Sequence, residues 1–150
     1  MDKISKIMSR KVKTISKNDS IVKAARLMFK GNVSCVVVIE KRKPIGLVSE
    51  RDLAVRVLDK NKNINELKVV DIMTAPILTV SSDTDVYYAS EIMRKNKIKK
   101  LPIVNKGNLA GIVTQTDILN YFRDQRKKFV LKSLKFKDRK NYPFVWEYFL

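Results

Sequence analysis

The feature that most constrains the fold is an internal repeat. Displaced by 65 residues and without any gap, residues 4 to 58 align with residues 69 to 123. Most aligned pairs keep their chemical class, so the hydrophobic pattern is preserved along the whole length. Such self-similarity indicates one structural unit used twice. Eleven aligned pairs are identical: Ile7/Ile72, Met8/Met73, Thr14/Thr79, Ser16/Ser81, Ala24/Ala89, Met28/Met93, Lys30/Lys95, Lys41/Lys106, Gly46/Gly111, Val48/Val113 and Asp52/Asp117.

Each copy predicts the same order of elements: an extended segment, a helix, two strands and a second helix. Polar residues at Asn18-Asp19-Ser20 and Ser82-Asp83-Thr84 are expected to cap the first helices, and Gly31 and Asn96 are suited to end them. In the first copy, strands are expected at Val36 to Ile39 and Ile45 to Ser49, and the second helix begins at Glu50. In the second copy, the strands are expected at Leu101 to Val104 and Leu109 to Thr114, and the second helix begins at Gln115.

Neither copy is expected to bury a core alone, because about 55 to 60 residues are marginal for a domain. We therefore predict an α/β (α+β) fold in which two pseudo-symmetric motifs, each with a small sheet and two helices, pack as one module. Motif 1 spans residues 4–58, a linker spans 59–68 and motif 2 spans 69–123. Residues 124–150 form a basic, aromatic C-terminal extension outside the repeat.

Two strings of residues recur in both copies at this offset. They are Val70-Asp71-Ile72-Met73-Thr74 and Gly111-Ile112-Val113-Thr114-Gln115-Thr116-Asp117-Ile118-Leu119, with counterparts Ile7-Met8-Ser9 and Gly46-Leu47-Val48-Ser49-Glu50-Arg51-Asp52-Leu53. Together with Leu101-Pro102-Ile103-Val104, they make the chain resemble the tandem CBS domain pair, or Bateman module. The first copy departs from this pattern, because Val37 stands where the second copy has Pro102.

The Gly-x-x-Ser/Thr-x-x-Asp string also has a chemistry of its own. A strand that ends in Ser49 or Thr114 and runs directly into a helix offers a hydroxyl and backbone N–H groups to a phosphate. Asp52 and Asp117, one helical turn later, are pure acceptors and suit the hydroxyls of a ribose. The alternative is that these residues only cap their helices. The repeat and the resemblance together favour ligand binding.

The resemblance implies that the ligand is AMP, ADP or ATP, with S-adenosylmethionine possible. Asp52 and Asp117 would then bind ribose, Ser49 and Thr114 would lie near phosphate, and Thr14 and Thr79 would edge the adenine. In the cleft of Asp117, Lys99 and Lys100 are expected to bind phosphate. Their counterparts are Ser34 and Cys35, so the cleft of Asp52 would depend on Arg51 for positive charge. The cleft of Asp117 is therefore predicted to bind more tightly.

Several classes of function are excluded by what the chain lacks. It has no histidine, which removes His-based acid/base catalysis and His-ligated metals, and Cys35 is its single cysteine. We expect no catalysis, no metal site and no catalytic cofactor. One cysteine favours a reducing, cytoplasmic location. The longest aliphatic run, Val36 to Ile39, is far short of the ~20 residues that cross a bilayer, so no membrane span is expected.

The charge points to an anionic partner, because 32 Lys and Arg face 15 Asp and Glu, for a net charge of +17. Residues 124–150 combine eight basic residues with seven of the twelve aromatics. This extension could pack on the module or a second subunit, with an extended segment from Tyr142, or it could bind nucleic acid. A homodimer is expected through an apolar stripe on the second helices: Leu53, Val57, Leu58, Ile118, Leu119 and Phe122.

Two hypotheses follow. The first is an intracellular adenine-nucleotide sensor that changes shape on binding and reports to an unidentified regulated protein. The second is a nucleic-acid-binding or scaffold protein that uses the paired motifs as a dimerisation frame.

Overall fold

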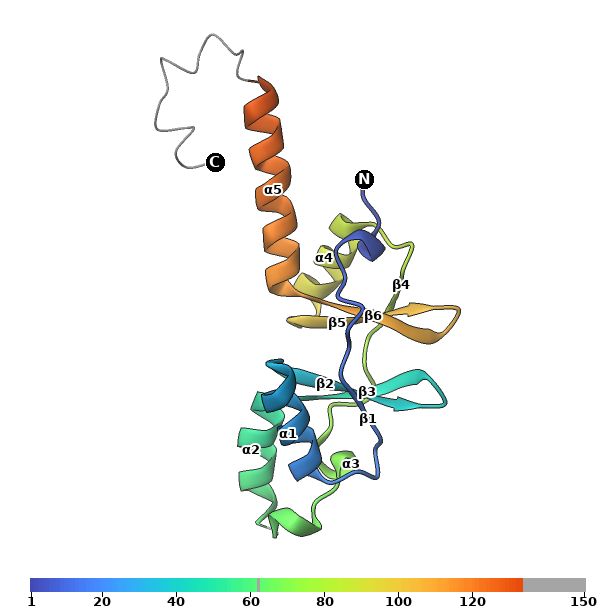
Figure 1. Ribbon diagram of the computed structural model, residues 1–150, viewed down its shortest axis with the longest axis vertical. Coiled ribbons are helices and arrows are strands. Elements are labelled where there is room, and N and C mark those ends of the chain that lie inside the picture. The colour runs from blue at the N-terminus through green and yellow to red at the C-terminus, as the bar shows by residue number, and fades with distance from the viewer. Residues whose placement is uncertain (62, 134–150) are drawn as a thin grey trace.

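The computed structural model describes residues 1–61 and 63–133. It confirms the α/β class, with two copies that stack along the long axis (Figure 1). The first copy contains η1 (Ile4–Lys6), β1 (Thr14–Ile15), α1 (Ile21–Gly31), β2 (Cys35–Glu40), β3 (Lys43–Ser49) and α2 (Glu50–Lys60). The second contains η2 (Ile64–Glu66), α3 (Val69–Ile72), β4 (Val80–Ser81), α4 (Val86–Lys95), β5 (Lys100–Asn105), β6 (Asn108–Thr114) and α5 (Gln115–Ser133).

Each copy builds a three-stranded sheet, in the order β1-β2-β3 or β4-β5-β6. The first strand runs parallel to the second, and the second and third form an antiparallel hairpin. The hairpin turns place Lys41 and Arg42, and likewise Lys106 and Gly107, at positive φ. Two consecutive positive φ values match the right-handed twist of the strands. The two sheets face each other in the middle of the module, with the helices outside (Figure 1).

The ends of the first helices differ in part from the prediction. Ser20 caps α1 as expected, but the cap of α4 is Asp85, whose carboxylate accepts hydrogen bonds from the N–H groups of Tyr87 and Tyr88. Asp85 is the repeat equivalent of Ser20, so the expected cap at residues 82–84 was wrong. As predicted, α1 ends at Gly31 and Asn96 caps the end of α4, but the left-handed residues lie one position later, at Asn32 with φ 48° and Lys97 with φ 53°.

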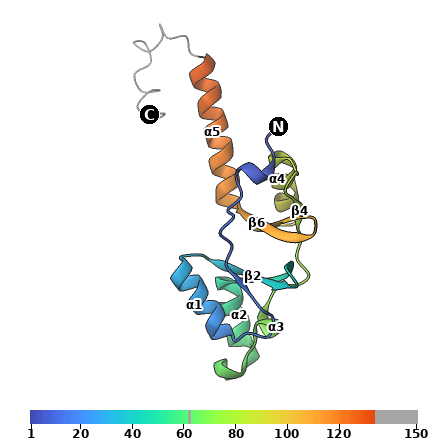
Figure 2. The same ribbon diagram turned by 45° about the vertical axis from the view of Figure 1, so that its right-hand side comes forward.

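The two copies exchange their first segments, which explains why they form one module. Ile4 and Met8 are buried in the core of the second copy, together with residues of its sheet and of α4. In return, Leu67, Val69 and Ile72 complete the core of the first copy. Both views show the N-terminal segment passing from one copy to the other (Figures 1 and 2). Each core therefore depends on residues that belong, by sequence, to the opposite repeat.

The exchange also explains two of the identities in the repeat. The exchanged first segments, residues 2–9 and 67–74, are called the crossing segments here. Short backbone bridges join Ser9 to Ile112 and Thr74 to Leu47, so each crossing segment lies directly over the other copy's hairpin. A Cβ on Gly111 would lie 2.7 Å from the sulfur of Met8 and 2.8 Å from the carbonyl oxygen of Ser9. Gly46 meets Met73 and Thr74 in the same way. A side chain at either position would push the crossing segment off the strand.

The last helix differs from its counterpart in length. α2 has 11 residues, whereas α5 has 19 and continues through residue 123, where the repeat ends. Its second half projects away from both sheets (Figures 1 and 2). In the described part of the chain, no helix is both long and apolar enough to cross a membrane. The extended segment predicted from Tyr142 lies outside the described residues.

Candidate functional site

A cavity of about 800 Å³ lies between the two copies, next to the start of α2. It gathers six of the ten predicted site residues, from both copies: Ser34, Ser49, Arg51, Asp52, Lys99 and Lys100. Its apolar lining includes Leu47, Val55, Pro76, Ile77, Leu78, Ile98 and Pro102. Ligand pockets in proteins commonly measure about 300 to 1,000 Å³ and combine such apolar walls with a few polar groups.

The Ser/Thr-x-x-Asp strings form the same capping box in both copies. In the first copy, the N–H and the Oγ of Ser49 both donate to Asp52 Oδ2 at 2.8 Å, and the N–H of Asp52 donates to Ser49 Oγ at 3.3 Å. The corresponding bonds of Thr114 and Asp117 measure 2.8, 2.7 and 3.3 Å. The capping role therefore exists in each copy, whether or not a ligand binds.

This geometry changes the expected role of the helix start. The N–H of Glu50 donates to the carbonyl of Ser34 at 3.1 Å, and the N–H of Asp52 is bound to Ser49. Gln115 donates to Lys99 in the same way, at 2.9 Å. The backbone groups that were expected to be free for a phosphate are thus largely occupied. Positive charge in the cavity must come from side chains.

The second oxygen of Asp52 is where the two copies differ. Asp52 Oδ1 accepts a hydrogen bond from Thr74 at 3.2 Å and lies 3.3 Å from Arg56 Nε. Arg56 also donates through Nη1 to the carbonyls of Ile72 and Met73, at 3.1 and 2.8 Å. Arg56 therefore joins the predicted ribose carboxylate to the crossing segment of the second copy. Asp52 is 8% exposed as a result, despite its charge.

Asp117 has a different environment, because Tyr121 occupies the position equivalent to Arg56. The hydroxyl of Tyr121 donates to Asp2, 3.3 Å away, instead of turning to Asp117. Burial raises the pKa of Tyr121, and the nearby carboxylate of Asp2 raises it further. The ion pair with Lys6 lowers the pKa of Asp2. Tyr121 therefore also connects α5 to a crossing segment, but it does so through Asp2 and not through the carboxylate of Asp117.

The cavity beside Asp52 is strongly cationic. Five basic side chains line it (Arg51, Arg56, Lys97, Lys99 and Lys100) against the two carboxylates of Glu50 and Asp52. At the five equivalent positions of the repeat, the residues are all uncharged: Thr116, Tyr121, Asn32, Ser34 and Cys35. The arrangement can hold a ligand with several negative charges next to an acceptor for hydroxyl groups.

The structure places the two lysines differently from the expectation, which grouped them with Asp117. Lys99, Lys100 and Pro102 line the cavity of Asp52, and neither of the two cavities described here includes Thr114 or Asp117. The reason is the exchange between copies, which brings the start of β5 opposite the start of α2. In the region equivalent to the cavity, the side chain of Lys13 lies against Gly31, where a Cβ would be 2.8 Å from Lys13 Cε.

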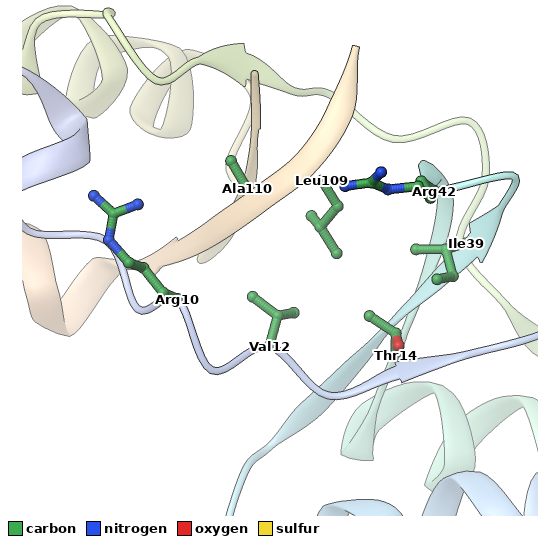
Figure 3. Close-up of a pocket in the computed structure, with 7 residues that line it drawn as sticks. All are labelled: Arg10, Val12, Thr14, Ile39, Arg42, Leu109 and Ala110. Carbon is green, nitrogen blue, oxygen red and sulfur yellow. The ribbon is translucent and has the colours of Figure 1, made fainter. Parts of the chain in front are cut away.

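Neither of the two predicted adenine-edge threonines lines the cavity of Asp52. Thr14 lines a smaller cavity of about 230 Å³ with Arg10, Val12, Ile39, Arg42, Leu109 and Ala110. Figure 3 shows Val12, Ile39 and Leu109 pointing into this hollow, while the guanidinium of Arg10 turns away from it. Thr79 lines neither cavity, although Ile77 and Leu78 line the large one.

Five polar residues of the large cavity were missed by the sequence analysis: Glu50, Arg56, Thr74, Asn96 and Lys97. Thr74 was visible as part of the string Val70-Asp71-Ile72-Met73-Thr74, but nothing in that string indicated that it would reach Asp52. Among the described residues, no group of three or more His, Cys, Asp and Glu side chains is placed to hold a metal ion. Burial raises the pKa of Cys35, which keeps its thiol protonated.

Half of the apolar stripe that was expected to form a dimer is used by the two cores. Ile118 is a buried member of the second core, and Leu53 and Val57 pack against the first. The other three predicted side chains, Leu58, Leu119 and Phe122, are exposed as expected, and Val55 is exposed beside them. The predicted stripe thus covers two sides of the second helices: one side packs on the core, and the other side is exposed.

Two α/β motifs that exchange their first segments and share a cationic cavity define a duplicated α/β module. The chain belongs to the CBS domain family: the family model, described as CBS domain, matches residues 4–59 and again residues 69–124. The resemblance of the sequence strings to this family is thereby confirmed.

Relatives and solved structures agree with this assignment. The chain is 39% identical over 118 residues to the uncharacterized protein MK0525 of Methanopyrus kandleri, with 77% of this chain and 60% of that protein covered. It is 30% identical to the CBS domain-containing protein YhcV of Bacillus subtilis, with 79% and 84% covered. The chain thus spans less than two thirds of the first of these relatives.

Among solved structures, the CBS domain pair of protein MJ0100 superposes with a TM-score of 0.73 at 28% identity, covering 83% of this chain and 98% of that one. That crystal structure is a complex with 5′-methylthioadenosine and S-adenosyl-L-methionine. An adenosine group is common to both of these ligands.

Proposed function

We propose that this chain is a regulatory module, without catalysis, that binds an adenine nucleotide in the cavity of Asp52. The observation that carries the proposal is the combination, in one cavity of about 800 Å³, of a buried carboxylate with five basic side chains. A carboxylate suits ribose hydroxyls, and the basic groups suit phosphates. The adenosine ligands of the MJ0100 structure support the same class of ligand.

The charge in the cavity favours ADP and ATP over AMP. Charge-assisted hydrogen bonds to phosphate are roughly twice as strong as neutral ones, so each added phosphate gains affinity while basic groups remain unpaired. S-adenosylmethionine carries no phosphate and should bind more weakly here. The predicted order of affinity is therefore ATP, then ADP, then AMP, with S-adenosylmethionine last.

Isothermal titration calorimetry with these four ligands tests the proposal. The informative variant is Lys99→Ala/Lys100→Ala, and the matched control is Lys60→Ala/Lys95→Ala, which removes two exposed lysines outside the cavity. We expect the first variant to lose at least tenfold in ATP affinity and the control to keep it. Absence of heat from all four ligands would refute the proposal, and equal losses in both variants would refute the choice of cavity.

The regulatory part of the proposal depends on Arg56 and Thr74. Both hold Asp52 Oδ1, so ribose hydroxyls that bind this oxygen must displace at least one of them. Because Arg56 also binds carbonyls at the end of α3, displacement would loosen the crossing segment. Ligand binding would thus change how the two copies hold each other, and a partner protein could sense this change.

We also propose that the module forms a homodimer through the exposed side chains of the second helices: Val55, Leu58, Leu119 and Phe122. A two-fold pairing would cover these side chains on both subunits. Light scattering coupled to gel filtration tests this proposal, and a monomer at micromolar concentration, with and without ATP, would refute it.

A further inference from the structure

The second half of α5 carries a concentrated positive charge that the nucleotide cavity does not use. Between Arg123 and Ser133 the chain has five basic residues and one acid, Asp124. Asp124 lies 3.9 Å from Arg123, and both side chains are more than half exposed, so this pair contributes little. This segment, here called the basic arm, projects away from the module (Figures 1 and 2).

The basic arm is poorly suited to stand alone as a helix. Arg123 and Lys127 are four residues apart, as are Lys128 and Lys132, and these two like-charged pairs outnumber the one opposite pair at this spacing, Asp124 and Lys128. Like-charged pairs destabilise a helix by about 0.2 to 0.5 kcal/mol each. The described parts of the molecule offer no sheet or helix alongside the arm in either view (Figures 1 and 2). An anionic partner would remove this repulsion.

The basic side chains lie on two opposite flanks. At about 100° per residue, Arg123, Arg126 and Lys127 share one flank, and Lys128 and Lys132 lie roughly 170° away from it. A helix in the major groove of B-DNA has one phosphate strand on each side. The groove is about 12 Å wide and accepts a helix with its side chains. Two basic flanks therefore match the two strands of a DNA duplex.

The same geometry disfavours two other anionic partners. A helix that lies on a membrane needs one apolar face, whereas Phe129, Val130 and Leu131 are consecutive and point in different directions around the helix. Duplex RNA has a deep, narrow major groove that side chains cannot enter. We infer that the basic arm is a binding site for the phosphate backbone of double-stranded DNA, without base specificity.

The expected strength follows from counting phosphate contacts. Five contacts give a slope of about −4.5 for the logarithm of the association constant against the logarithm of salt concentration. Between about 50 and 200 mM salt, affinity should therefore fall roughly 500-fold. Loss of two contacts should reduce the slope to about −2.7.

The test is fluorescence anisotropy of the full chain with a labelled random-sequence DNA duplex of about two helical turns, roughly 20 base pairs. The variant is Lys128→Glu/Lys132→Glu. The matched control is Arg26→Glu/Lys30→Glu, which makes the same change of net charge at exposed positions of α1. We expect the arm variant to bind DNA more than tenfold more weakly at low salt, and the control to stay within threefold of the parent.

Each alternative outcome contradicts the inference. Equal losses in the two variants would mean attraction by net charge alone. Equal or tighter binding of duplex RNA, single-stranded DNA or anionic vesicles would rule out recognition of a DNA duplex. No binding at low salt would remove the site altogether. Because a folding defect in the arm could imitate the expected loss, Lys128→Gln/Lys132→Gln, which removes the repulsion, must also weaken binding. Calorimetry with ATP on the same variants keeps this test separate from the proposed nucleotide site.

Discussion

The two aspartates of the repeat provide a matched pair of substitutions, because their capping bonds agree within 0.1 Å. Asp52→Asn and Asp117→Asn should therefore weaken the same cap by similar amounts. Only Asp52 lies in the large cationic cavity. The difference in ATP affinity between the two variants consequently reports on ribose binding and not on the loss of a helix cap.

The magnitude follows from the bonds that are exchanged. Two ribose hydroxyls would each donate to the carboxylate and displace one existing donor, because Ser49 already binds Oδ2 and Thr74 and Arg56 already bind Oδ1. The net gain is therefore about one hydrogen bond to a charged group, or about 1.5 to 3 kcal/mol. Asp52→Asn should lose roughly 10- to 150-fold in ATP affinity. Asp117→Asn should lose less than threefold.

Calorimetric titration with ATP measures both affinities, and urea denaturation measures both stabilities. Asp52→Asn is expected to be the less stable variant, since it also weakens the pair with Arg56, so titrations are run where both variants are fully folded. Equal losses of affinity, or a larger loss for Asp117→Asn, would refute the assignment of the nucleotide to the cavity of Asp52.

Three further predictions concern single positions. Arg56→Tyr places at this position the residue that the second copy has at Tyr121. It should lower the free energy of unfolding by about 1 to 2 kcal/mol, because the charged hydrogen bonds to the carbonyls of Ile72 and Met73 are lost. An unchanged urea unfolding curve would contradict this prediction. Gly111→Ala should lower the free energy of unfolding by about 1 to 3 kcal/mol, and by more than Gly46→Ala, because the new Cβ would lie 2.8 Å from a backbone oxygen instead of 3.2 Å. Thermal unfolding of both variants gives the order. The reverse order would contradict this comparison of the two contacts. Cys35 should be alkylated by iodoacetamide more slowly in the folded protein than in urea, with a rate still rising above pH 9, because burial raises its pKa. A fast reaction that levels off below pH 9 would contradict that burial.

Local features of this fold were predictable from the sequence. The second helices begin at Glu50 and Gln115 as expected, because Ser or Thr followed three residues later by Asp is a local signal for a helix start. The start of α4 was placed too early, since residues 82–84 are also polar and short. Strict use of the repeat would have paired Ser20 with Asp85.

The composition of the cavity was not predictable in the same way. Ser34, Ser49, Arg51 and Asp52 are close in sequence or on adjacent strand ends, and they line one cavity. The assignment of Lys99 and Lys100 depended on which copy they face, and that is decided by the exchange of first segments. Thr74 reaches Asp52 across 22 residues through the same exchange. No local pattern reports such a contact.

The crossing segments also bear on how a chain of this kind can arise. A chain with only one copy would expose the surface that Ile4 and Met8, or Val69 and Ile72, cover here. Two such chains could complete each other by a reciprocal domain swap, but their folding would then depend on concentration. Joining them through residues 59–68 turns that encounter into an intramolecular step, with an effective concentration set by the connection. The stability of the duplicated chain therefore does not depend on protein concentration, whereas a single-copy chain would unfold on dilution.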